Sequence, residues 1–385
     1  MNKSLVMICS QYPPSYGGAG KQAQLLSAAL VRRGWNVSVV TLDQDSKGSA
    51  EEDKVRVTRL LRGMAATSTF RRTVTTLGLG LGAAVIVLTR RPHAVHVHGA
   101  YWWSIPPLLA ARLVRATTIV KVTRDGEDDP ETVMNRRIAD LIPVGWLYGL
   151  SFRLADNVVT LSTEAFDKAT RRLESHSKVK LVRNGVDVAA LKRTDIRRNR
   201  AREVFGVGAQ TRITTFVGYL VEHKGVLDLL AAWQQRAGSA GEELWLVGPY
   251  DGYYRELTSK VLAEVVKAQE AGFNIRLFGH VEASQMPSIY WATDVFTLPS
   301  YAEGMPNSLA EAMVAGCAVV ATDIPGITDI VKPGYGDLVS PGDVQALARA
   351  LDRAQDVQSD GNAADMDLGI ERIAEILEGI YDAPR

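Results

Sequence analysis

Short apolar runs alternate along this chain with longer segments of helical periodicity. The runs span four or five residues, are rich in β-branched side chains and lie at 5–9, 37–41, 94–98, 118–122 and 158–161, then at 213–217, 244–247, 275–278, 295–298 and 318–321. Because they show little polar alternation, they are typical of strands buried on both faces of a parallel sheet. Helical patterns such as 21–33 and 309–315 lie between them, and each is followed by a glycine, Gly34 or Gly316, at the usual capping position. The alternation predicts an α/β protein with two doubly wound domains.

A polar, basic segment at 192–200 separates the two sets of strands. It has no apolar periodicity, so we expect a solvated linker, with an anion-binding patch as the alternative. The expected domains are therefore 1–190 and 205–365. Near the end of the chain, apolar residues recur at helical spacing and predict an amphipathic helix within 366–385. They are Ile373, Ile376, Leu377 and Ile380.

Composition narrows the function classes. The 385 residues include 44 Lys and Arg against 43 Asp and Glu, a net charge of +1, which argues against a nucleic-acid-binding protein. Cys9 and Cys317 are too far apart, in apolar surroundings, for a disulfide framework or a zinc site, and they suit a reducing cytoplasm. The charge is unevenly distributed, since residues 1–190 carry +10 and residues 191–385 carry −9. The two halves therefore face different partners, or each other.

A glycine-rich loop, PPSYGGAGK at 13–21, joins the first strand to the first helix. Glycines there let a ligand approach the backbone and meet the free N–H groups at the start of the helix. The spacing matches neither a Rossmann fingerprint nor a Walker loop. The loop alone is equally consistent with a tight turn that binds nothing.

Three charged residues of the second half are candidates for ligand binding. Glu303 and Glu311 are eight residues apart and would be ~12 Å apart on one helix, too far for the ~5 Å carboxylate pair of a retaining glycosidase. Gly304 and Pro306 place Glu303 on a loop, with a helix beginning near Ser308. A capping box from Ser308 to Glu311 is the alternative explanation of Glu311. Lys224 follows a strand, where parallel sheets bind ligands, and could neutralise a phosphate.

Several segments of the chain, taken together and in their order along the sequence, resemble glycosyltransferase family 4, the retaining GT-B enzymes that use nucleotide sugars. The resemblance covers nearly the whole chain, and its most specific part is the pair of glutamates at 303 and 311, followed by GCAVVATD and a Pro-Gly-Asp loop. The matching segments are PPSYGGAG at 13–20, HVHGAYW at 96–102, KLVRNGVDV at 180–188, FVGYLVEHKG at 216–225, LWLVGPYDG at 244–252, AGCAVVATDIPGITDIV at 315–331 and GDLVSPGD at 336–343.

The resemblance implies two Rossmann-like domains that face each other across a cleft. The first would bind the acceptor, the second the nucleotide sugar, and the last helix would cross back to the first domain. Lys224 would hold the donor diphosphate, Glu311 the ribose and Glu303 the transferred sugar, so that Lys224, Glu303 and His98 are the catalytic candidates. The backbone from Gly304 through Met305 and Pro306 to Asn307 would receive phosphate or sugar oxygens, and Gly17 and Gly18 would close over the diphosphate.

This chain departs from the family pattern at two positions. The family usually has an arginine five residues before the lysine, where this sequence has Tyr219. Many members also have a histidine where this sequence has Thr123. Arg124 and His98 are the candidates to compensate for these two changes. Thr123, Arg124 and Asp125 are expected on the acceptor side.

Two clusters raise the question of a metal. The acidic loop 125–130 could hold a divalent cation, as in GT-A enzymes, but it lacks a clean Asp-x-Asp, and we expect a solvated or acceptor-facing loop. His93, His96 and His98 lie close together without an evident further ligand. His98 is expected to contact substrate and His96 to be buried and hydrogen-bonded. We expect neither a metal nor a cofactor.

The expected function is transfer of a hexosyl group, with retention, from a UDP- or GDP-sugar to a saccharide or lipid-linked acceptor in cell-envelope polysaccharide or glycoconjugate synthesis. The alternative is a non-catalytic sugar-nucleotide-binding protein on the same fold. The apolar segments 74–88 and 141–154 predict buried helices, or helices lying on a bilayer. With the positive first half, they predict a cytoplasmic enzyme, peripheral on the inner face of an anionic membrane. The alternative is that the positive half only offsets the negative one.

Overall fold

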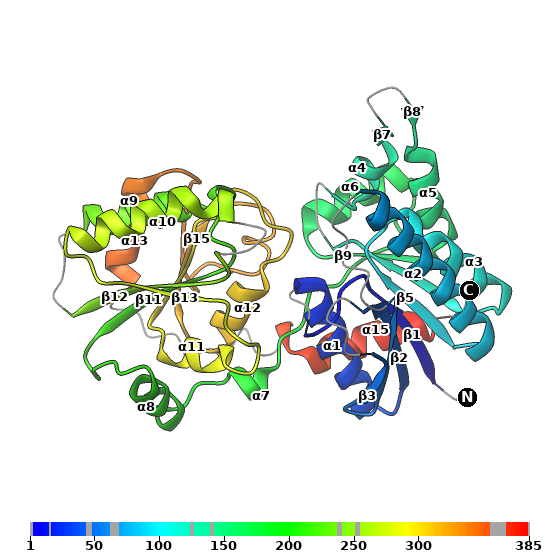
Figure 1. Cartoon of the computed structure of the whole chain (residues 1–385), viewed down its shortest axis with the longest axis horizontal. Helices are drawn as coiled ribbons and strands as arrows, with labels where there is room; N and C mark the ends of the chain where they lie inside the picture. Colours follow the sequence, from blue (N-terminus) through cyan, green and yellow to red (C-terminus); the bar gives the residue numbers. More distant parts are fainter. Residues whose placement is uncertain are drawn as a thin grey trace. The chain divides into compact units, whose positions relative to one another are not determined.

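The computed structural model describes residues 3–14, 17–43, 48–61, 69–123, 127–138, 142–236, 241–250, 255–354 and 367–383. The chain divides into two compact units. Unit 1 comprises Met1–Gly185 and Ile370–Arg385, and unit 2 comprises Val186–Gly369. Each unit is a predominantly parallel β-sheet with helices on both faces (Figure 1). Two α/β domains with parallel sheets, as predicted, are thus confirmed.

The sheet of unit 1 has the strand order β10-β9-β6-β5-β1-β2-β4-β3, and only β3 is antiparallel to its neighbour. Helices α1 (Gly18–Arg32) and α15 (Ile370–Tyr381) share one apolar core with the sheet. Helices α2 (Thr69–Arg90), α3 (Ile105–Leu113) and α5 (Gly145–Leu154) share the other. The strands are β1 Ser4–Ile8, β2 Asn36–Leu42, β3 Ala50–Glu52, β4 Val55–Leu60, β5 Ala94–His98, β6 Thr117–Lys121, β9 Asn157–Thr160 and β10 Val179–Leu181.

Four shorter elements complete unit 1. They are the helical turn η1 (Trp102–Ser104), the helices α4 (Pro130–Met134) and α6 (Thr163–Leu173), and a small hairpin of β7 (Arg137–Ile138) with β8 (Ile142–Pro143).

The sheet of unit 2 is parallel throughout, with the order β13-β12-β11-β14-β15-β16. Its strands are β11 Arg212–Val217, β12 Glu242–Val247, β13 Ile275–Gly279, β14 Val295–Leu298, β15 Ala318–Thr322 and β16 Asp337–Val339. Its helical elements are α7 Val188–Leu191, α8 Asp195–Val204, η2 Glu222–Lys224, α9 Val226–Gln235, α10 Arg255–Glu270, α11 Met286–Ala292, α12 Asn307–Val314 and α13 Val344–Ala354.

The last helix, α15, belongs to unit 1 although the whole of unit 2 precedes it in the chain. Its Glu378 accepts hydrogen bonds from Lys3 at 2.5 Å, from Arg33 at 2.8 Å and from the Trp35 indole at 3.1 Å. The Tyr381 hydroxyl, fully buried, lies 2.8 Å from Nδ1 of His96. Polar contacts therefore fix both the position and the register of this amphipathic helix on the sheet.

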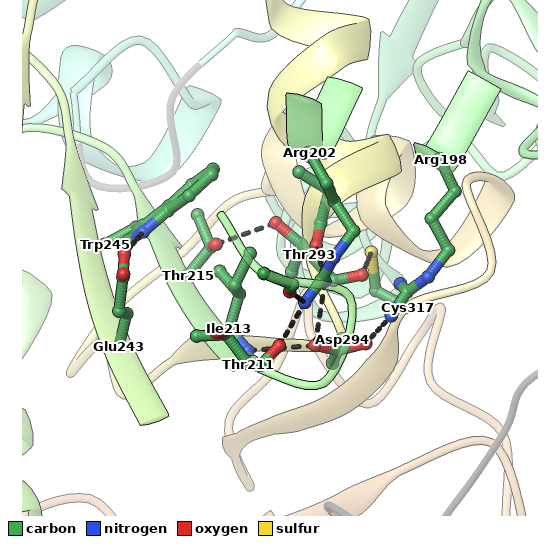
Figure 2. Close-up of polar contacts among 12 residues, drawn as sticks. Arg198, Arg202, Thr211, Ile213, Thr215, Glu243, Trp245, Thr293, Asp294 and Cys317 are labelled. Atoms are coloured by element: carbon green, nitrogen blue, oxygen red, sulfur yellow. Dashed lines mark hydrogen bonds and ion pairs between the residues drawn. The ribbon is translucent and has the colours of Figure 1, made fainter. Parts of the chain in front are cut away.

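The expected solvated linker at 192–200 is wrong, because most of this segment forms the docked helix α8 of unit 2. Thr194 caps the helix by accepting a hydrogen bond from the Arg197 amide. Arg198 and Arg202 donate hydrogen bonds at 2.6 and 3.4 Å to Asp294, which follows α11. Figure 2 shows both arginines directed toward this carboxylate. Arg202 is 3% exposed and also donates to the carbonyl of Thr211. The helix is thus held by the buried guanidinium of Arg202 and the half-buried one of Arg198 rather than by an apolar stripe. Unit 2 begins at Val186 rather than at 205.

Within the described residues, one helix is long and apolar enough to cross a membrane by length and composition. The window Thr73–Arg90 of α2 has a mean hydropathy of 1.5, and 28% of it is buried in the protein. A core helix of a water-soluble protein satisfies the same criterion.

Candidate functional site

The topology of unit 2 locates one edge of its sheet where a ligand would bind. From β11 the chain proceeds through β12 to β13 in one direction, and β14, β15 and β16 follow in the other. The carboxyl ends of β11 and β14 therefore form a topological switch point, the usual place for ligands in doubly wound sheets. Lys224 follows β11 in η2, and Glu303 follows β14 in the next loop.

Lys224 and Glu303 form an ion pair at this switch point. Nζ of Lys224 lies 2.7 Å from Oε1 of Glu303, and their side chains are 20% and 9% exposed. The Ser300 hydroxyl donates to the same carboxylate oxygen at 2.7 Å. Ser300 is itself fixed, because the Thr322 hydroxyl at the end of β15 donates to its carbonyl at 2.6 Å. Three neighbouring strands thus place one cation and one carboxylate at a single edge.

Glycines allow the loops around this pair to pack backbone to backbone. Gly225 has φ +68°, and a Cβ there would collide with the Pro299 carbonyl oxygen. Gly326 has φ +83°, and its Cβ would lie 2.5 Å from the Gly304 carbonyl oxygen. The loops after β11, β14 and β15 therefore hold one another, and any side chain at Gly225 or Gly326 would push them apart.

Helix α12 begins at this same edge. Its N-cap is Pro306, and Asn307 is its first residue. The helix follows a strand and runs back across the sheet, so its N-terminus lies at the carboxyl edge, where first-turn amides and the helix dipole favour an anion. The segment from Gly304 to Asn307 thus stands next to Glu303, with Met305 buried and the other residues of the segment at least partly so.

The capping-box explanation of Glu311 is wrong. Ser308 lies inside α12, and its hydroxyl donates to the Val217 carbonyl at the end of β11 at 3.1 Å. Glu311 is 5% exposed, and its Oε2 accepts a hydrogen bond from the Tyr290 hydroxyl of α11 at 2.8 Å. Its role toward a ribose stays a prediction.

Two further residues of this edge bear on the site. Tyr219, at the position of the family arginine, is partly exposed just after β11. His223 precedes Lys224, and burial, followed by the charge of Lys224, lowers the pKa of its imidazole. A neutral His223 adds no charge to this edge. Neither Ser300 nor His223 stood out in the sequence, because a serine or a histidine in a loop has no distinguishing pattern.

The sheet of unit 1 has its own switch point between β1 and β5. The glycine-rich loop follows β1 and leads to Gly17, the N-cap of α1, and to Gly18, its first residue. A Cβ on Gly17 would lie 2.5 Å from Oε1 of Gln11. The absence of a side chain thus keeps the start of α1 against the strand end, while Ser15 and Tyr16 lie outside the described residues.

His98 ends β5 at this switch point, on the same face as His96. Their rings stack at 4.6 Å. His96 is buried and hydrogen-bonded to Tyr381, as predicted. Both ring nitrogens of His98 are buried without a hydrogen-bond partner in the described part of the chain. Burial lowers the pKa of His96 to about 3 and that of His98 well below its usual value, so both rings are neutral. Contact of His98 with substrate stays a prediction.

Lys121, which ends β6 beside His98, is a functional candidate that the sequence interpretation missed. It is 4% exposed, and its Nζ donates to Oδ1 of Asn184 at 2.7 Å. Burial lowers the pKa of its ammonium to about 8. A lysine that ends an otherwise uncharged strand was the available signal. Gly185, which follows Asn184 in the chain, exchanges two hydrogen bonds with the Gln22 side chain of α1.

The acidic loop 125–130, expected to be solvated or to face the acceptor, is described from residue 127 on, and there Glu127 is exposed whereas Asp128 and Asp129 are buried. Asp128 is fully buried and accepts hydrogen bonds from the amide and the hydroxyl of Thr123. Asp129, 1% exposed, caps α4 by accepting from the Thr132 amide. Arg124 and Asp125 lie outside the described residues. Across the residues that the structure describes, no group of three or more His, Cys, Asp or Glu side chains could hold a metal ion.

Each of the two units matches a known protein family. The glycosyl transferase 4-like domain family matches residues 17–185, and the glycosyl transferases group 1 family matches residues 211–356. The 2-deoxystreptamine N-acetyl-D-glucosaminyltransferase of Streptomyces fradiae is 31% identical over 361 residues, covering 87% of this chain and 81% of that protein.

Solved structures share the fold. Sucrose-phosphate synthase from Thermosynechococcus elongatus aligns with a TM-score of 0.79 at 20% identity, over 98% of both chains. Anabaena HepE, solved in complex with UDP-glucose, aligns with a TM-score of 0.71 at 16% identity, over 98% of this chain and 99% of that one. With matches over both units and along nearly the whole length of relatives, the chain belongs to the GT-B glycosyltransferases of the family 4-like kind.

Proposed function

We propose that this glycosyltransferase moves a hexosyl group from a UDP- or GDP-sugar to a saccharide hydroxyl with retention of configuration. The observation that carries the proposal is the Lys224–Glu303 pair at the switch point of unit 2, beside the start of α12. A cation and a helix N-terminus suit a diphosphate, and a carboxylate suits sugar hydroxyls, from which it can accept hydrogen bonds.

Support for a nucleotide sugar comes from both kinds of comparison. HepE binds UDP-glucose, and the Streptomyces fradiae relative is named for transfer of N-acetyl-D-glucosamine to 2-deoxystreptamine. We assign Glu311 to the ribose. Its helix, α12, contacts the end of β11 through the hydrogen bond from Ser308 to the Val217 carbonyl. Tyr219 replaces the expected arginine, so Lys224 carries more of the diphosphate charge here than in relatives that have both cations.

In the proposed reaction the bond from the anomeric carbon to the diphosphate oxygen breaks, and the bond to the acceptor oxygen forms on the same face of the sugar. The acceptor proton passes to an oxygen of the departing diphosphate. Lys224 and the first-turn amides of α12 stabilise the negative charge that grows on this leaving group. Glu303 orients the sugar hydroxyls, so the protein contributes mainly positioning and electrostatic stabilisation.

We also propose that the reaction requires no metal and no cofactor. The support is that the cation of Lys224 and the helix terminus already supply positive charge at the diphosphate site. The acidic residues Asp128 and Asp129 are engaged by Thr123 and by the N-terminus of α4.

A rival proposal is a sugar-nucleotide-binding protein without transferase activity. Thr123 favours it, because the position where many family members have a histidine is used here to hold Asp128. Against it, Lys224, Glu303 and Glu311 are all present. Lys224 and Glu303 meet at the edge of one sheet, where α12, the helix that carries Glu311, begins.

The test is a transfer assay with a panel of UDP-, GDP- and ADP-sugars and saccharide acceptors, read by nucleotide release and by NMR of the product. We expect release with one donor class and an anomeric configuration identical to that of the donor. Inverted product would contradict retention. Tight nucleotide binding without transfer or donor hydrolysis across the panel would favour the rival.

A further inference from the structure

Helix α2 exposes an unusually apolar outer face. Five large side chains at helical spacing lie on it, each between 39% and 59% exposed, namely Val74, Leu77, Leu81, Val85 and Leu88. The sequence from Thr73 to Thr89 contains no charged residue. A surface helix normally presents polar or charged side chains to water, so this face is suited to an apolar environment.

The opposite face of α2 is committed to the core of unit 1. Leu79, Ala83 and Val87 are fully buried against the sheet. Gly80 packs so closely that a Cβ there would lie 2.5 Å from the Trp103 carbonyl oxygen. Crossing a membrane would require α2 to leave this core and expose the sheet. The helix therefore stays on the protein and offers only its outer face.

Helix α3 enlarges the apolar face. It packs beside α2 (Figure 1), and its Leu109 and Leu113 are 47% and 77% exposed. We call these seven side chains of α2 and α3 the α2–α3 surface. Arginines flank its end, since Arg91 directly follows α2, and the exposed Arg112 and Arg115 lie at the end of α3. The surface thus combines apolar side chains with cations at its border.

The positive charge around the α2–α3 surface indicates which kind of partner can cover it. From Lys54 to Arg124 the chain has twelve Lys and Arg residues and no Asp or Glu. Arg59 and Lys121 are buried, whereas Arg91, Arg112 and Arg115 at the border of the surface are exposed. A second copy docked through a two-fold axis would bring the same cations against themselves. Anionic lipid headgroups complement them, and each well-placed cation strengthens attraction to such a surface. An apolar stripe bordered by arginines has the character of a helix lying in the headgroup region.

We propose that the α2–α3 surface docks on an anionic lipid bilayer, with the outer face of α2 lying at the boundary between headgroups and acyl chains. This goes beyond the proposed function, because the surface lies outside the donor site. Combined with that function, it favours a lipid-linked saccharide as acceptor and a role in cell-envelope polysaccharide synthesis.

The test is co-sedimentation of the full chain with vesicles, without donor or acceptor. Phosphatidylcholine vesicles containing about 30 mol% phosphatidylglycerol should bind the protein, pure phosphatidylcholine much less, and binding should fall as salt screens the headgroups. The variant Leu81→Glu/Val85→Glu should bind these vesicles at least about tenfold more weakly than the parent, because it places charge where apolar area is to be buried. The variant Arg91→Gln/Arg115→Gln should lose affinity for anionic vesicles only.

A matched control is Ile196→Glu on α8 of unit 2, since Ile196 is 81% exposed but lies outside the α2–α3 surface. It should bind vesicles like the parent. Absence of binding to anionic vesicles at low salt would overturn the proposal, as would equal loss in the control. A dimer that Leu81→Glu/Val85→Glu dissociates, without vesicle binding by the parent, would assign the surface to a second copy instead. UDP binding by the same variants separates this outcome from failure of the donor site, because folded variants should bind UDP like the parent.

Discussion

Replacing Lys224 by methionine isolates the contribution of one positive charge to the donor site. Methionine keeps most of the apolar stem and removes the ammonium group that lies 2.7 Å from Glu303. A hydrogen bond to a charged group contributes about 1.5–3 kcal/mol. If Lys224 holds the donor diphosphate, Lys224→Met should raise the Kd for the nucleoside diphosphate by about 10- to 150-fold.

The same change also acts on folding, because it leaves Glu303 without its cation. Glu303 is 9% exposed and keeps the hydrogen bond from Ser300. Leaving a largely buried carboxylate with one partner fewer costs about 1–3 kcal/mol. For a unit of this size, each kcal/mol lowers the melting temperature by about 2–4 °C, so Tm should fall by a few degrees.

A second variant separates the two effects. Lys224→Met/Glu303→Gln removes both charges, so Tm should recover, while the affinity for the diphosphate stays low. Calorimetric titration with UDP and GDP, with thermal melting alongside, measures both quantities. Parental affinity in Lys224→Met would refute the assignment. Affinity restored in the double variant would show that Lys224 acts only by neutralising Glu303.

Four further results are expected. Glu311→Gln should weaken nucleotide binding about tenfold with little change in Tm, since glutamine can still accept the Tyr290 hydrogen bond; unchanged calorimetric affinity would remove the ribose role. Excess EDTA should leave transfer intact, and loss of activity that magnesium or manganese restores would contradict metal independence. Burial lowers the pKa of Lys121 in the folded protein to about 8, against an ordinary value of 10.5. Because the unfolded chain therefore binds more protons between these two pH values, the free energy of unfolding should rise with pH across that window by on the order of 3 kcal/mol. Denaturant titrations of Lys121→Met at a series of pH values should lack this rise. The hydrogen bond from Lys3, with those from Arg33 and Trp35, lowers the pKa of Glu378 to about 2, so its stabilisation is present above its ordinary pKa near 4.5 and lost as the pH falls toward 2; acid unfolding of Glu378→Gln should lose that part of the slope.

The periodicity of the chain was sufficient to predict the strands and the two α/β domains, because a buried parallel strand has a strong local signature. The meeting of Lys224 and Glu303 was also within reach. Both follow predicted strands, and the carboxyl ends of parallel strands share one edge. What the sequence lacked was the strand order, which makes β11 and β14 neighbours.

Other features depend on partners far away in the chain and escaped prediction. The segment that forms helix α8 was interpreted as a linker because it has no apolar stripe. Its Arg198 and Arg202 instead donate to Asp294 and to the Ala292 carbonyl, 90 or more residues away in the chain. The loop 125–130 was expected to be solvated or to face the acceptor, because the sequence does not reveal that Thr123 donates hydrogen bonds to Asp128. Local patterns report burial of apolar side chains well, and burial of charged groups poorly.

Unit 2 is inserted into the chain of unit 1, and the two points where the chain passes from one unit to the other lie next to each other. The chain leaves unit 1 at Gly185 and returns at Ile370, and a Cβ on Gly185 would lie 2.6 Å from Cδ1 of Ile370. The ends of unit 2 are equally close, because Val186 pairs with Gly369 in a β-bridge. Insertions whose ends are neighbours are tolerated by their host domains. Deleting 186–369 and joining 185 to 370 through a short glycine-serine loop should therefore yield a folded host domain that retains the α2–α3 surface and can be studied on vesicles without any nucleotide chemistry.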